Sequence, residues 1–440
     1  MKIKLLAFTI VFSLNYSCNE TSTSQGNYKY NYETVDNDIT NTLIYTLDNG
    51  LKIYMSINKD EPRIQTNIAV NSGSKQDPSD ATGLAHYLEH MVFKGTSKIA
   101  TINWEKEKVI LSEISNLYEK RRSISDKDER KAIYRKIDSL SGLAAQYAVP
   151  NEYDKMISSI GAKGTNAYTS SERTVYINEI PSNEFEKWLS IEAERFSELV
   201  LRLFHTELEA VYEEYNRGKD NDYRLANETM SSKLFKKHTY GTQTTIGTGE
   251  HLRNPSMEKI HQYFNDWYVP NNMAIILSGD INPDVTVDLI KQYFGTFEYK
   301  DVPIFEAAVE DEINEPEYVS VTGTNTAWVN IGYRLPGIKS EDIYMMDLFD
   351  GLLNNGQAGL IDLNLIKGQK VLEAYCYGEV MKDYSVFELQ GVPRIGQSLD
   401  EVKDLLLAEV EKIKSGDFED WLLKAVIKNF KLREQEGLLY

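Results

Sequence analysis

The stretch of sequence with the clearest chemical potential is His86-Tyr-Leu-Glu-His90, in which two histidines flank a glutamate. On an α-helix, residues three and four positions apart share a face, so His86, Glu89 and His90 would project together. Two imidazoles one turn apart suit a single Zn²⁺ ion, and a carboxylate between them can take a proton from water. This H-x-x-E-H order inverts the zincin motif. The alternative is an ordinary surface helix that carries two histidines.

A catalytic zinc also needs a third protein ligand and an open position. In the acidic stretch 207–217, Glu207 and Glu214 are seven residues apart and share one face of a predicted helix. Glu209 and Glu213 point elsewhere. By itself this stretch is typical of a solvated acidic helix. Beside an H-x-x-E-H motif, it becomes the best source of the third ligand.

The zinc motif lies in a predicted helix over 82–93, whose apolar residues recur at helical spacing. Asn49-Gly50 between two alternating runs predicts a β-hairpin. The rest of the first half predicts strands at 64–70, 161–180 and 273–277, helices at 184–201, 207–217, 257–264 and 285–293, and loops over 219–256. The charged residues 103–148 predict two amphipathic helices in a hairpin with a solvated face.

The second half repeats this order in diverged form. Residues 301–317 are acidic and carry Pro303 and Pro316, which predicts a domain linker. Beyond it we expect strands at 327–333, 375–380 and 386–391, and helices at 344–353, 399–415 and 418–434. The predicted fold class is α+β, with two related domains, each an antiparallel-rich mixed sheet with helices packed on one face.

Several further motifs accompany the zinc motif in the sequence. They are residues 83–96 around it, 164–169 with 172–176, 207–217, and 268–273 with 279–280. Over roughly residues 40–440 the chain resembles the pitrilysin/insulinase family of zinc metallopeptidases, the inverzincins. The resemblance implies one Zn²⁺ per catalytic domain, with His86, His90 and Glu214 as its ligands. It makes Glu89 the general base. Glu207 becomes the carboxylate that hydrogen-bonds a ligand and steadies it.

The distance between the second histidine and the third ligand departs from the family pattern. His90 and Glu214 are 124 residues apart, which is more than the family usually has. We attribute the excess to residues 103–148 as a helical-hairpin insertion.

The resemblance also implies how a peptide substrate is held. A substrate strand would add beside Asn166, Ala167, Tyr168 and Thr169, and its main chain would supply most of the hydrogen bonds. Without the family match, Asn166-Ala167 would be interpreted as a simple turn.

The predicted function is that of a zinc-dependent endopeptidase acting on peptides or unfolded segments. The alternative is a non-catalytic binding or scaffolding member of the same fold. A purely structural zinc site fits less well, because such sites are usually rich in cysteine, and neither Cys18 nor Cys376 lies near these residues in sequence. Zinc content together with peptide turnover separates these functions.

The sequence pattern at the N-terminus predicts that the protein is exported. Lys2 and Lys4 precede a short apolar run over 5–14, which fits a secretory signal over residues 1–18. Cys18 makes a lipoprotein signal and membrane anchoring through lipidated Cys18 the alternative to simple cleavage. We expect a periplasmic or cell-envelope protein, and a flexible linker over 19–40.

The composition limits the other partners. With a net charge of −19, the chain is a poor candidate for binding nucleic acid.

The length of 440 residues allows two domains joined by a linker. We expect a catalytic domain over 41–300, the linker over 301–317 and a second, non-catalytic domain over 318–440 that is truncated. The family forms a clam-shell of two such halves, and the second half contributes an Arg/Tyr pair for which this chain has no convincing equivalent. We therefore expect the second half-shell to come from missing C-terminal sequence or from a partner subunit.

Overall fold

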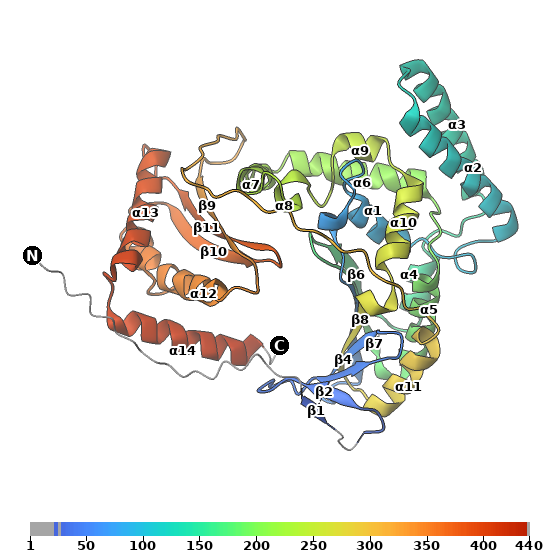
Figure 1. Ribbon diagram of the computed structural model, residues 1–440, viewed down its shortest axis with the longest axis horizontal. Helices are drawn as coiled ribbons and strands as arrows, with labels where there is room; N and C mark the ends of the chain where they lie inside the picture. Colours follow the sequence, from blue (N-terminus) through green and yellow to red (C-terminus); the bar gives the residue numbers. More distant parts are fainter. Residues whose placement is uncertain (1–21, 25–27, 438–440) are drawn as a thin grey trace, which may run out of the picture.

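The described residues form two β-sheets, one before and one after the segment 298–328. The computed structural model describes residues 22–24 and 28–437, so the expected signal over 1–18 lies outside the described residues. The first sheet has eight strands in the order β1-β2-β3-β4-β8-β5-β7-β6, and the second has three in the order β10-β11-β9. We call the parts built on them the first lobe, up to residue 297, and the second lobe, from residue 329 (Figure 1).

Nearly all strands of the first sheet run antiparallel to their neighbours, and only β4 and β8 pair in parallel. The strands are β1 (Ser22–Ser24), β2 (Tyr32–Thr34), β3 (Leu43–Thr46), β4 (Lys52–Ile57), β5 (Arg63–Val70), β6 (Lys163–Thr169), β7 (Thr174–Pro181) and β8 (Met273–Gly279). β3 and β4 form the hairpin predicted from Asn49-Gly50, where Gly50 takes a φ of +85°. β6 lies at the end of the sheet, and no other strand of the described residues pairs with its outer edge.

The segment expected as a flexible linker over 19–40 instead contains two strands that extend this sheet. β2 pairs with β3, and the ring of Tyr32 packs against those of Tyr28 and Tyr45. The Lys29 ammonium lies 2.7 Å from a carboxylate oxygen of Asp288. The prediction failed because strands of three residues are too short to show a period-2 pattern.

The helices of the first lobe pack around the sheet and the zinc motif. They are α1 (Leu84–Val92), α2 (Trp104–Ser123), α3 (Lys127–Ala145), α4 (Glu152–Ser159), α5 (Phe185–Ser197), α6 (Phe204–Lys219), α7 (Asp222–Leu234), α8 (Thr239–Thr242), α9 (Gly249–Arg253), α10 (Met257–Trp267) and α11 (Pro283–Phe294). The predicted apolar face of α1 is buried, with Leu88 and Met91 both 0% exposed. Residues 219–256, expected as loops, contain α7, α8 and α9.

α2 and α3 form an antiparallel hairpin that projects from the first lobe (Figure 1). Ile114 and Ile137 are buried on its inner faces, as the amphipathic pattern predicts. A buried ion pair joins α2 to the segment before α6: Arg202 Nε donates to Glu107 Oε1 over 2.7 Å. Arg202 also donates to three backbone carbonyls, so its charge is well satisfied.

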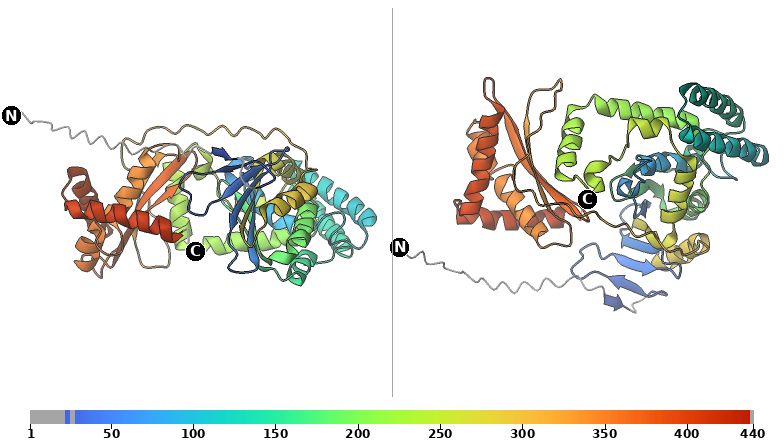
Figure 2. Two further views of the ribbon diagram at one scale, coloured as in Figure 1. Left: turned by 90° about the horizontal axis from the view of Figure 1, so that it is seen from below. Right: turned by 45° about the horizontal axis from the view of Figure 1, so that its top comes forward.

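The second lobe has its own core. Its elements are β9 (Val329–Pro336), α12 (Asp342–Leu353), a π-helical turn (Asp362–Lys367), β10 (Glu373–Val380), β11 (Tyr384–Val392), α13 (Leu399–Ser415) and α14 (Asp420–Gly437). α12 and α13 pack on the sheet and α14 packs on α12, while β9 contacts α7 of the first lobe. Residues 298–328, which include the expected linker, run between the lobes as an extended segment (Figure 2). Within the described part of the chain, no helix is both apolar and long enough to cross a membrane.

Candidate metal centre

The start of α1 is held in place by one buried carboxylate. Asp77 accepts hydrogen bonds from the backbone N–H groups of Gly83, Leu84 and Ala85 over 2.8, 3.1 and 2.9 Å. Gly83 has a φ of +84°, and a Cβ there would lie 2.4 Å from the carbonyl oxygen of Ile246. Only glycine fits such a close approach, so the helix that carries the histidines begins at a defined residue and direction.

The structure brings His86, His90 and Glu214 together. His86 Nε2 lies 3.3 Å from His90 Nε2 and 3.5 Å from Glu214 Oε2, and His90 Nε2 lies 3.9 Å from the same oxygen. A tetrahedral Zn²⁺ with bonds of about 2.0–2.1 Å separates its ligand atoms by roughly 3.3 Å. The three side chains therefore match the spacing and the donor types that a zinc ion requires.

Electrostatics agrees with that fit. Burial, together with the charges of His90 and Arg224, lowers the pKa of His86 to about 4. The imidazole is therefore neutral at pH 7, which is the form that binds a metal. Its Nε2 faces His90 and Glu214 and is the atom directed at the shared site. The buried Nδ1 of His86 has no hydrogen-bond partner among the described residues.

Glu207 lies behind the second histidine. Its Oε1 is 2.9 Å from His90 Nδ1, and its Oε2 is 2.6 Å from the ammonium of Lys94. Although burial opposes it, these two hydrogen bonds lower the pKa of Glu207. An ionised Glu207 accepts the Nδ1 proton of His90 and leaves the Nε2 lone pair free to face His86. Sequence reasoning missed Lys94, whose only signal is its position four residues after His90.

Glu89 lies between the histidines on α1 and is 7% exposed. The Thr169 hydroxyl of β6 donates to its Oε2 over 2.6 Å. Burial raises the pKa of Glu89, although the bond from Thr169 opposes that effect. The edge strand and the H-x-x-E-H helix are therefore joined by a direct hydrogen bond, which the sequence pattern did not indicate.

These groups open onto a cavity of about 880 Å³. Ala167, Tyr168 and Thr169 of β6 line it, whereas the exposed Asn166 does not. One wall is α7, which contributes Tyr223, Arg224, Asn227, Glu228 and Ser231. Sequence reasoning missed this wall, although Asn221 followed by Asp222 is a helix-start signal, and Asn221 indeed caps α7 by accepting from the Arg224 backbone N–H.

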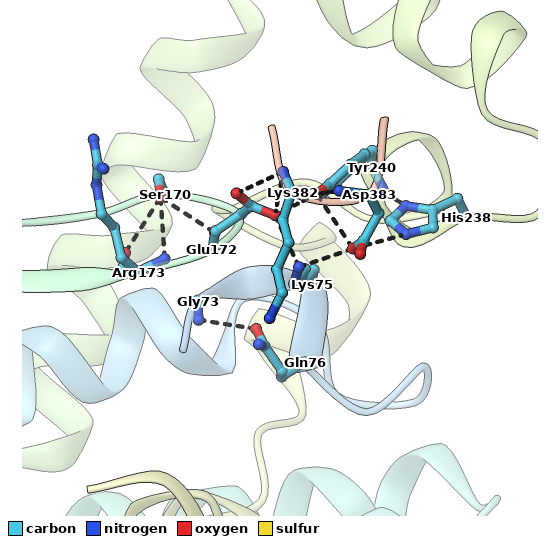
Figure 3. Close-up of polar contacts among 10 residues, drawn as sticks. All are labelled: Gly73, Lys75, Gln76, Ser170, Glu172, Arg173, His238, Tyr240, Lys382 and Asp383. Carbon is cyan, nitrogen blue, oxygen red and sulfur yellow. Dashed lines mark hydrogen bonds and ion pairs between the residues drawn. The ribbon is translucent and has the colours of Figure 1, made fainter. Parts of the chain in front are cut away.

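The second lobe reaches the same cavity through the turn between β10 and β11. The ammonium of Lys75, 3% exposed, lies 2.8 Å from a carboxylate oxygen of Glu172 and 2.8 Å from one of Asp383 (Figure 3). Tyr240 also donates to Glu172, and His238 Nε2 is 3.4 Å from Asp383. Glu172 lies in the turn that follows β6. This charged cluster therefore joins the second lobe to the end of the edge strand.

Comparison with known proteins identifies the family to which this fold belongs. Residues 53–113 and 140–248 match the family described as "Insulinase (Peptidase family M16)". Residues 256–430 match the one described as "Peptidase M16 inactive domain". The chain belongs to the pitrilysin/insulinase family of zinc metallopeptidases, as its motifs predict.

Individual relatives are distant in sequence. The chain is 22% identical to "Zinc protease PqqE" of Helicobacter pylori over 90% of this chain and 78% of that protein. A crystal structure of a protease from Helicobacter pylori superposes with a TM-score of 0.69 at 22% identity, over 90% of this chain and 86% of that one. The periplasmic protease PqqL from Escherichia coli superposes with a TM-score of 0.66 at 18% identity, over 92% of this chain and 41% of that one. The predicted fold, half of a pitrilysin-type clam-shell, is confirmed.

Proposed function

We propose that this chain is a zinc-dependent endopeptidase acting on peptides or unfolded segments. The observation that carries the proposal is the convergence of His86, His90 and Glu214, whose ligand atoms all lie within 4.8 Å of one another. Glu89 and the edge strand β6 line the same cavity. A structural zinc site would be closed by a fourth protein ligand, and no further ligand joins this cluster in the part of the chain that the structure describes.

In the proposed mechanism His86, His90 and Glu214 hold the metal, and Glu207 fixes the orientation of His90. The chemistry that zinc supplies when bound is Lewis acidity, which polarises a peptide carbonyl and makes water a nucleophile near neutral pH. Glu89 accepts the proton of the attacking water and later returns it to the leaving amine. The Thr169 hydroxyl donates a hydrogen bond to Oε2 of Glu89. No hydrogen bond from the described residues reaches Oε1 of Glu89, so this oxygen can accept the proton.

The substrate is proposed to bind as an added strand beside Asn166–Thr169. Within the described residues, β6 is an edge strand with a pairing partner on one side only, which supports this mode. Because main-chain hydrogen bonds supply most of the affinity, cleavage should tolerate many sequences. Asn166 is exposed on β6, where its amide could hold the substrate backbone.

The domain division and the location belong to the same proposal. We place the catalytic domain at 41–300 and the second domain at 318–440, with residues 103–148 as an insertion. The family match omits residues 114–139, which lie within the α2–α3 hairpin, and this gap supports the insertion. The description of Escherichia coli PqqL as periplasmic supports export, with removal of residues 1–18 or lipidation at Cys18. The second half-shell would come from further sequence or from a partner subunit.

The decisive experiment compares the wild-type protein with Glu89→Gln, which keeps the shape of the side chain and removes its basicity. Both proteins should contain one zinc per chain. Hydrolysis of an unstructured peptide, followed by mass spectrometry, should fall at least 100-fold in the variant, because general-base catalysis contributes about 10²–10⁴-fold.

Two results would count against this function. Unchanged hydrolysis by Glu89→Gln would refute the role of Glu89. A wild-type protein that binds zinc and cleaves no peptide in the library would identify a non-catalytic binding or scaffolding member of the family.

A further inference from the structure

A second cavity, of about 700 Å³, lies between the α2–α3 hairpin and α6. None of the residues that line it lines the first cavity. α6 contributes Glu209 and Glu213 to the second cavity and Glu214 to the first, so the two cavities lie on different faces of one helix. A volume of this size is typical of sites that bind small organic molecules.

The side chains that line this second cavity are strongly cationic, although the whole chain has a net charge of −19. Five of them are basic: Arg121, Lys127, Arg130, Lys131 and Arg253. None forms an ion pair within 4.0 Å with a carboxylate of the described residues. Glu209 and Glu213 also line the cavity, but the positive charges outnumber them.

Two of the three arginines, Arg121 and Arg253, contact groups other than acids. Arg121 donates to the backbone carbonyl of Arg253 over 2.7 Å, and its guanidinium lies 5.4 Å from the ring centroid of Tyr134. The guanidinium of Arg253 lies 5.6 Å from the ring centroid of Tyr212. Stacking on rings orders a guanidinium without neutralising it, so the positive charge remains available to an anion.

One of these cations, Arg121, is in an unfavourable electrostatic environment. Burial and the charge of Arg130 both lower the pKa of Arg121. The buried Nε of Arg121 has no acceptor among the described residues. Lys127, Lys131 and Arg253 are exposed at the rim. A bound anion would offset the repulsion between Arg130 and Arg121 and would supply an acceptor for the unpaired Nε.

We propose that this cavity binds a small anion that carries two or more phosphate groups. Arginine forks match phosphate oxygens in a bidentate manner, and several cations placed around one volume favour an anion with more than one charge. Tyr134, Tyr212, Leu208 and Leu252 add an apolar portion of the wall that suits the organic part of such a ligand. The proposal does not depend on peptidase activity.

The test is calorimetric titration of the purified protein with inorganic triphosphate and with adenosine triphosphate at low ionic strength. The informative variant is Arg130→Gln/Lys131→Gln, which removes two cavity charges. The matched control is Arg135→Gln/Lys136→Gln, which removes the same charge from the same helix α3 outside the cavity. Wild-type protein should bind one triphosphate per chain, and the cavity variant should bind it at least tenfold more weakly. The control should change the affinity less than twofold.

Either of two outcomes overturns the proposal. One is the absence of saturable binding of both probes up to about 1 mM, which is weaker than a built anion site would give. The other is equal weakening in the two double variants, which would mean that only the net charge matters. Phosphates that bound the metal centre instead would bind both variants as tightly as the wild type, which also contradicts a site in this cavity.

Discussion

At the scale of single residues, Glu213 and Glu214 are adjacent in sequence and lie on different sides of α6. Glu214 faces His86 at 3.5 Å, whereas Glu213 lines the second cavity. The spacing from Glu207 favours Glu214 as the ligand, and the geometry is consistent with that choice. The two neighbours therefore form a matched pair for testing which of them binds the metal.

We expect Glu214→Gln to lower the zinc content of the purified protein severely, because an amide is a poor ligand and leaves only two nitrogen donors. Glu213→Gln removes the same charge from the same helix and should retain one zinc per chain. Elemental analysis after dialysis against a weak chelator measures both. Equal zinc content in the two variants would mean that another residue is the third ligand.

At the scale of elements, the start of α1 fixes the direction of both histidines. Asp77, 4% exposed, supplies acceptors for three backbone N–H groups that no helical carbonyl can reach. Asp80, three residues later, is more exposed and pairs with Lys259 and Arg122 at the surface. Substituting each aspartate in turn therefore compares the contribution of a helix cap with that of a surface ion pair.

Asp77→Ala should lower the free energy of unfolding by about 2 kcal/mol, because it leaves the N–H groups of α1 without acceptors. Asp80→Ala should cost less than about 1 kcal/mol, since surface ion pairs contribute little. Chemical denaturation of both variants measures the difference. An Asp77→Ala protein as stable as Asp80→Ala would contradict the capping role.

The sequence predicted those elements whose residues carry a local pattern. α1 and α6 were found because i, i+3, i+4 and i+7 spacings place their side chains on one face. α7 was missed because only Asp222 and Leu234 are buried on it, which leaves no apolar period. β2 was missed because it is three residues long. The pairing of Lys75 with Glu172 and Asp383 was beyond prediction, since these residues are far apart in the chain.

In the whole molecule, a charged cluster joins the two lobes beside the first cavity. Lys75, His238 and Tyr240 of the first lobe all face Asp383. Although burial opposes it, the ammonium of Lys75 lowers the pKa of Asp383. Leu234 and Phe235 of the first lobe also pack against Val386 of the second. This apolar contact, the charged cluster and the contact of β9 with α7 therefore all join the lobes.

This arrangement predicts a pH dependence with a defined sign. A carboxylate whose pKa is lower in the folded protein stabilises it above the unfolded pKa, about 4 for aspartate. That stabilisation is lost as the pH falls through the folded pKa. The free energy of unfolding of the wild type should exceed that of Asp383→Asn by about 2 kcal/mol between pH 5 and 7. The difference should shrink below about pH 4.

Denaturation curves of both proteins from pH 7 to pH 3 give this difference directly. Asp301→Asn, which removes an exposed carboxylate from the segment between the lobes, is the control and should match the wild type throughout. A difference between wild type and Asp383→Asn that stayed constant down to pH 3 would show that the charge of Asp383 does not stabilise the contact.

We propose that one zinc ion is bound between α1 and α6 by two imidazoles and a carboxylate. X-ray diffraction from crystals of the zinc-loaded protein, recorded on both sides of the zinc absorption edge, tests it most directly. We predict one anomalous peak per chain, about 2.0–2.1 Å from the Nε2 atoms of His86 and His90 and beside the Glu214 carboxylate. The absence of a peak at this position, or a peak elsewhere in the chain, would contradict the account.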